Sequence, residues 1–159
     1  MAVIPVWRVI AEVESGNNPR AVRFEGNVYM RLLASEALKH YDAVLTRVLG
    51  YRPSVATVAA LCAISWGKFQ ILGQNLYAGW DGAGPLTRLD PFAFLQDERE
   101  QLEALRKFDE RYLRVGVDRD FAGLSRAEIE ALARRYNGPG NVAVYASRLR
   151  EAHRRLAAG

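Results

Sequence analysis

The chain has 159 residues, of which 50% are hydrophobic and 25% charged, with a net charge of +4 and a sequence pI near 9.5. These values are typical of one globular domain, long enough to bury a core without disulfides or a structural metal. The single Cys62 excludes an internal disulfide, and the isolated His40 and His153 do not have the spacing of zinc ligands. We therefore expect no metal and no cofactor.

The chain contains no apolar segment long enough to cross a membrane. Its longest apolar run, residues 55–63, is interrupted by Thr57 and falls far short of the roughly 20 residues that a span needs. The N-terminus mixes Pro5, Arg8 and Glu12 with apolar residues, unlike a signal peptide. We therefore expect synthesis in the cytoplasm and no stable membrane insertion. The positive charge favours an anionic partner such as nucleic acid, a membrane surface or the bacterial cell wall, without choosing among them.

Hydrophobic residues recur at helical spacing through most of the first half of the chain. Residues 4–15 are predicted to form a helix, which the string Gly-Asn-Asn-Pro at residues 16–19 ends. Residues 20–27 alternate loosely and predict an extended segment, and helical spacing then continues over residues 29–49. Residues 54–65 are almost all apolar, which predicts a helix buried on most of its circumference at the centre of the domain.

The second half begins with a glycine-rich stretch, residues 79–85, which predicts a surface loop. Asp90 and Pro91 are typical of an N-cap and a first helical position, and they open one amphipathic helix that continues to Phe108. A capping-box pattern at residues 125–128 predicts another helix. An arginine-rich helix, whose apolar stripe includes Tyr145, ends the chain. No linker, repeat or low-complexity tract separates these segments. The sequence therefore predicts one mainly α domain, with a small β element near residues 20–30.

Glu14 is the most informative position in the sequence. It follows Val13 at the end of an apolar helix and precedes Ser15 and Gly16, which puts a carboxyl at a cleft edge with apolar neighbours. Partial burial favours the protonated form of a carboxyl. A protonated carboxyl is what a glycosidic oxygen needs from a general acid, because the leaving alcohol departs poorly without a proton. Taken alone, this string more often marks a helix end with a solvated glutamate.

Three further segments follow Glu14 in a specific order: Phe24-Glu25, then SWGKFQILG at residues 65–73, then ARRYNGPG at residues 133–140. Together with Glu14-Ser15-Gly16, these segments resemble the N-acetylmuramidase family of phage endolysins, which belongs to the lysozyme-like superfamily. The resemblance extends from about residue 4 to residue 156. It implies that residues 1–159 form a single lysozyme-like catalytic domain.

The resemblance implies a muramidase that cleaves the β-1,4 bond between N-acetylmuramic acid and N-acetylglucosamine in bacterial peptidoglycan. It implies Glu14 as the catalytic acid and Glu25 as a second carboxylate, which activates water or stabilises an oxocarbenium-like transition state. An ion pair between Glu25 and Arg23 is the structural alternative. Gly26-Asn27 and Phe69 depart from the family pattern, and these changes affect the substrate subsites more than the reaction.

The same resemblance implies three substrate-binding residues, and the aromatic residues add further candidates. Gln70 is expected to face the cleft, Tyr136 to lie beside the catalytic glutamate and Asn137 to contact a sugar. Trp66 and Trp80 offer rings that stack on sugar faces, although a buried position is the more typical one for Trp66. The structural alternatives are a glutamine amide bonded to the backbone and a Tyr-Asn pair that simply ends a helix.

Other functions fit parts of the sequence. A lytic transglycosylase acts on the same bond with one glutamate, lets the muramic acid 6-hydroxyl attack, and leaves a product that lacks one water. A basic module that binds nucleic acid is disfavoured, because 18 acidic residues are interspersed and no recognition motif is present. A non-catalytic wall-binding or phage structural domain would not need Glu14. We therefore predict a monomeric endolysin, made in the host cytoplasm, that reaches peptidoglycan through a holin-made lesion.

Overall fold

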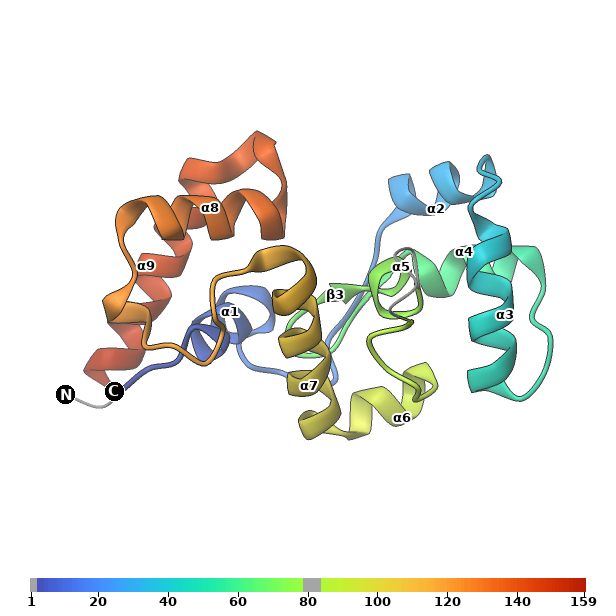
Figure 1. Cartoon of the computed structure of the whole chain (residues 1–159), viewed down its shortest axis with the longest axis horizontal. Helices are drawn as coiled ribbons and strands as arrows, with labels where there is room; N and C mark the ends of the chain where they lie inside the picture. The colour runs from blue at the N-terminus through green and yellow to red at the C-terminus, as the bar shows by residue number, and fades with distance from the viewer. Residues whose placement is uncertain (1–2, 79–83) are drawn as a thin grey trace. The chain divides into compact units, whose positions relative to one another are not determined.

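The computed structural model describes residues 3–78 and 84–159. The chain divides into two compact units, the first formed by Met1–Asn17 with Leu105–Gly159 and the second by Asn18–Ala104. The described residues form nine α-helices and one three-stranded sheet (Figure 1), which confirms the predicted mainly α fold with a small β element. Within these residues, no helix combines the length and the hydrophobicity that crossing a bilayer requires.

The first unit is built around three helices, α1 (Val6–Ser15), α8 (Arg126–Asn137) and α9 (Val142–Ala158). Helix α9 packs against both α1 and α8 (Figure 1). The predicted capping box is present at the start of α8, where the Ser125 side chain and the Glu128 backbone N–H are hydrogen-bonded. The π-helix Asp109–Leu113 and the 3-10 turns Phe121–Gly123 and Pro139–Asn141 complete this unit.

The second unit contains the helices α2 (Gly26–Leu33), α3 (Leu38–Leu49), α4 (Val55–Cys62), α5 (Gly73–Leu76) and α6 (Pro91–Gln96). Helix α7 (Glu98–Phe108) has residues in both units. Hydrophobic spacing predicted two continuous helices here, and the structure divides each of them into two. Between α2 and α3 the Ser35 hydroxyl accepts the Ala37 N–H, and between α6 and α7 the Asp97 carboxylate accepts two backbone N–H groups. Such side chains compete with helical hydrogen bonding and favour a new helix start.

The sheet of the second unit consists of β1 (Val22–Phe24), β2 (Ile64–Trp66) and β3 (Ile71–Leu72) in the antiparallel order β1-β2-β3. Strand β1 lies in the segment predicted to be extended. Strand β2 corrects the prediction of a helix over residues 54–65, because α4 ends at Cys62 and the strand begins at Ile64. The chain reverses between β2 and β3 at Gly67 and Gln70, whose φ angles of +74° and +50° are left-handed.

Helix α4 is buried mainly toward its C-terminal half, so the prediction of a helix buried on most of its circumference holds for that half only. Val58, Ala59 and Cys62 are buried, whereas Val55 is 66% exposed. Burial raises the pKa of the Cys62 thiol to about 12, as expected for a cysteine that acts as a small core residue. Helix α5 begins against α4 at Gly73, where a Cβ would lie 2.0 Å from the carbonyl oxygen of Leu61.

Candidate active site

Glu14 lies in the last turn of α1 and is half-buried. The helix ends at Gly16, whose φ of +62° is left-handed, so its N–H bonds the carbonyl of Glu12 at 3.2 Å. The N–H of Asn17 bonds the carbonyl of Ala11 at 3.0 Å. These two bonds satisfy the final carbonyls of the helix and end the helix directly after Glu14 and Ser15. The predicted end of the first helix is therefore confirmed.

The carboxyl group of Glu14 is held by a tyrosine 131 positions away in the sequence, since the Tyr145 hydroxyl on α9 donates a hydrogen bond to its Oε1 atom. Tyr145 is 2% exposed. Burial, followed by the negative charge of Glu14, raises its pKa well above the ordinary value. The hydroxyl therefore keeps its proton and remains a donor to this carboxyl group.

Tyr136 lies beside this pair. Its ring stacks on that of Tyr145 with centroids 6.1 Å apart and an interplanar angle of 12°, and Phe108 meets it edge-on at 6.1 Å. Burial and then the charge of Glu14 raise the pKa of Tyr136. Asn137 is exposed as the last residue of α8. The structure thus brings Tyr136 into the surroundings of Glu14, with Tyr145 as the residue that makes the hydrogen bond.

The second predicted carboxylate, Glu25, lies in the second unit at the N-cap position of α2. Its Oε1 atom accepts a hydrogen bond from Nε of Arg23 at 2.6 Å and one from the Ser65 hydroxyl at 3.4 Å. Arg23 and Ser65 are partners in the register of β1 and β2, so the sheet sets the position of this carboxylate. The side chain of Glu25 is 32% exposed. The ion pair with Arg23, named above as the alternative, is thus present, and a catalytic role for Glu25 stays a prediction.

Trp66 and Gln70 also lie in the second unit, where they support the turn between β2 and β3. Trp66 is 5% exposed and its indole N–H donates to the carbonyl of Leu61 at 3.1 Å, which places the ring in the core rather than on a surface where sugars stack. Gln70 is 8% exposed, and its amide nitrogen donates to the carbonyls of Ala21 and Gly67 at 3.1 and 3.0 Å. Both N–H groups of this amide are therefore used by the backbone, so a substrate contact would involve Oε1. Trp80 lies outside the described residues.

Sequence reasoning missed two buried polar residues. Tyr145 was one member of the apolar stripe of the last helix, and no local signal distinguishes it from a core residue. Gln101 is fully buried; it accepts the Lys68 backbone N–H at 2.8 Å and donates to two carbonyls, which fastens the turn after β2. The sequence signal that could have identified Gln101 is a glutamine on the inward face of the amphipathic helix α7. Across residues 3–78 and 84–159, no group of three potential metal ligands is found.

Comparison with known proteins places the chain in a family. The N-acetylmuramidase family profile matches residues 43–157, more than half of the chain, so the chain belongs to the N-acetylmuramidase family. Among curated proteins it is similar to the endolysin of Enterobacteria phage PRD1, with 31% identity over 104 residues. That match covers 65% of this chain and 65% of the endolysin, just under two-thirds of its length. No solved structure matches the chain significantly.

Proposed function

We propose that this protein is a peptidoglycan hydrolase of the muramidase type, which cleaves the β-1,4 bond between N-acetylmuramic acid and N-acetylglucosamine. The observation that carries the proposal is the carboxyl group of Glu14, half-buried at the end of α1 and oriented by the Tyr145 hydroxyl. A carboxyl group that is shielded and fixed in this way suits a general acid, which must hold a proton and deliver it to the glycosidic oxygen along a defined direction. Membership of the N-acetylmuramidase family supports the same reaction.

Glu25 is proposed as the second carboxylate of this reaction. Arg23 and Ser65 hold it through Oε1. In this proposal it activates water or stabilises the positive charge that develops on the sugar. Tyr136 and Asn137 are proposed to contact the substrate beside Glu14, with the exposed amide of Asn137 as a hydrogen-bonding group. Gln70 would contribute its amide oxygen, and Trp66 would support the hairpin that carries it.

We further propose that the protein acts as a monomeric endolysin, with both units forming one catalytic domain. The similar phage protein is named an endolysin, and the net charge of +4 favours association with an anionic cell wall. In this proposal the enzyme is made in the host cytoplasm and reaches peptidoglycan after holin-mediated release. Water is the only cosubstrate, so no cofactor takes part.

The decisive experiment is the Glu14→Gln substitution, assayed by lysis of bacterial walls. The amide keeps the side-chain volume but carries no acidic proton, so lysis should be abolished while the melting temperature stays nearly unchanged. Glu130→Gln is the matched control, because it makes the same chemical change on the exposed side of α8. Lysis at a tenth of the wild-type rate or more would disprove the role of Glu14.

Two further measurements complete the test. Glu25→Gln should reduce activity strongly yet leave more residual activity than the Glu14 substitution, whereas full activity would assign Glu25 to the ion pair with Arg23 alone. Mass spectrometry of the digested wall distinguishes the reaction type. A hydrolase leaves products that contain the added water, and a lytic transglycosylase leaves products that are lighter by one water.

A further inference from the structure

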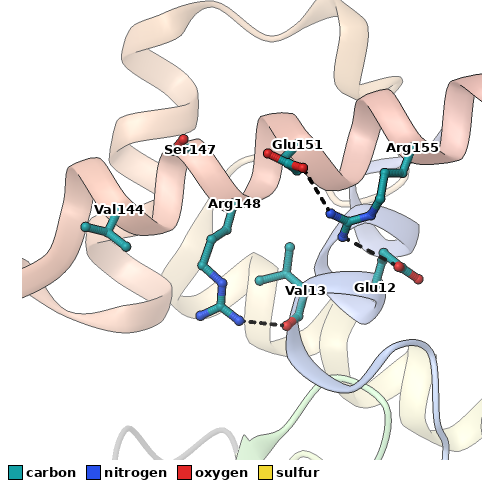
Figure 2. A pocket seen from close by; sticks show the side chains of 7 residues that line it. All are labelled: Glu12, Val13, Val144, Ser147, Arg148, Glu151 and Arg155. Carbon is teal, nitrogen blue, oxygen red and sulfur yellow. Dashed lines mark hydrogen bonds and ion pairs between the residues drawn. The ribbon is translucent and has the colours of Figure 1, made fainter.

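A cavity of about 560 Å³ lies within the first unit, between α1 and α9. Its lining combines two arginines, two glutamates, one serine and two valines. The lining residues are Glu12, Val13, Val144, Ser147, Arg148, Glu151 and Arg155. Figure 2 shows the side chain of Val13 between the guanidinium groups of Arg148 and Arg155. The cavity is therefore an apolar patch flanked by charges of both signs.

Two residues that line the cavity are sequence neighbours of the hydrogen-bonded pair in the candidate site. Val13 and Val144 line the cavity, and the residues that follow them, Glu14 and Tyr145, form the hydrogen bond of the candidate site. Arg148 links the two helices at this point, because its guanidinium donates to the carbonyl of Val13 at 3.3 Å (Figure 2). A ligand group in the cavity would therefore lie within one helical turn of the residues that form the candidate site.

The charged side chains of the cavity are held by long ion pairs. Arg155 lies 3.7 Å from Glu12 and 3.5 Å from Glu151, and the Arg155 side chain is 55% exposed. Exposed pairs of this kind contribute between about 0 and 1 kcal/mol, so a ligand carboxylate or amine can replace one partner at little cost. The cavity can thus present positively and negatively charged side chains to a ligand without a change in its walls.

We infer that this cavity binds the peptide stem of peptidoglycan, a short peptide that carries carboxylates, an amino group and small apolar side chains. In this arrangement Arg148 and Arg155 bind carboxylates, Glu12 and Glu151 bind the amine, and Val13 contacts an alanine methyl. A bare glycan carries few charges that could pair with these four charged side chains. The phosphates of a nucleic acid would be repelled by the two carboxylates. The inference rests on the proposed function, because the stem is attached to the muramic acid of the cleaved bond.

The test compares stem-bearing peptidoglycan with the same glycan after an N-acetylmuramoyl-L-alanine amidase has removed the stems. Arg155→Ala should lower kcat/KM on stem-bearing glycan by about three- to fivefold, the upper range for one partly exposed ion pair, and by less than about 1.5-fold on stem-free glycan. Glu151→Gln should show the same selectivity. The matched control Arg126→Ala removes an equal charge from α8, where the side chain is 85% exposed, and should affect both substrates alike. Equal losses by Arg155→Ala on the two glycans, or no loss on either, would overturn the inference.

A binding measurement keeps this inference separate from the proposed function. The stem tetrapeptide L-Ala-D-Glu-diaminopimelate-D-Ala contains no glycosidic bond, so its binding tests the cavity whether or not the protein cleaves glycan. In an NMR titration, amide signals of Val13, Ser147 and Arg148 should shift saturably, and Arg155→Ala should weaken the binding. Unchanged signals at millimolar peptide would overturn the inference. By contrast, full lysis by the Glu14→Gln variant would overturn only the proposed function.

Discussion

The hydrogen bond from Tyr145 to Glu14 makes a quantitative prediction for the variant Tyr145→Phe. The ring of Tyr145 is 2% exposed and stays in place in this variant, so only the hydroxyl and its bond to Oε1 are lost. A hydrogen bond to a charged group contributes about 1.5 to 3 kcal/mol. If this bond fixes the carboxyl group for proton transfer, kcat/KM should fall by about 10- to 150-fold. The melting temperature should fall by about 3 to 12 °C, because each kcal/mol corresponds to about 2–4 °C in a domain of this size.

The assay is the release of reducing ends from purified peptidoglycan as a function of pH. The bond is expected to act on the orientation of the carboxyl group, so its loss should lower the rate at every pH. Tyr77→Phe is the matched control, because it removes a buried hydroxyl that donates to the carbonyl of Leu89 at 3.3 Å. The control should lower stability without affecting the profile. A Tyr145→Phe enzyme with activity within twofold of wild type at every pH would refute the positioning role.

Three further predictions concern stability and reactivity. Gly73→Ala should cost about 1 to 3 kcal/mol of unfolding free energy in urea titrations, because its Cβ would lie 2.0 Å from a carbonyl oxygen of α4; unchanged stability would mean that α5 shifts freely. Native Cys62, whose pKa burial raises to about 12, should resist thiol reagents at neutral pH and react only after unfolding, so rapid native labelling would contradict its burial. The pKa of Glu128 is lowered from 4.5 to about 2, mainly by the hydrogen bond from the Ser125 backbone N–H. The wild-type protein should therefore be more stable than the Glu128→Gln variant, fully so above pH 4.5 and no longer so toward pH 2. A difference in stability that does not depend on pH would exclude this bond as its source.

The sequence alone predicted the features that depend on neighbouring residues. Asp90 does cap α6, with Pro91 at its first position, and Ser125 does form a capping box, because caps join groups two or three residues apart. The burial of Cys62 followed from its apolar neighbours. Each of the four motifs that carry the resemblance is also local, and together they indicated the N-acetylmuramidase family that the comparison assigns. The matched residues 43–157 begin after both proposed catalytic carboxylates.

The tertiary structure decided what lies next to these motifs. Hydrophobic periodicity shows that a residue faces inward but not which residue it meets, so Tyr145 could be predicted as buried and not as the partner of Glu14. The same limit applies to residues 54–65, where an apolar run gave no sign that α4 would end at Cys62 and that β2 would follow. There the pairing with β1 and the amide of Gln101 select a hairpin. Both outcomes depend on contacts between residues distant in sequence, and only the folded chain brings such residues together.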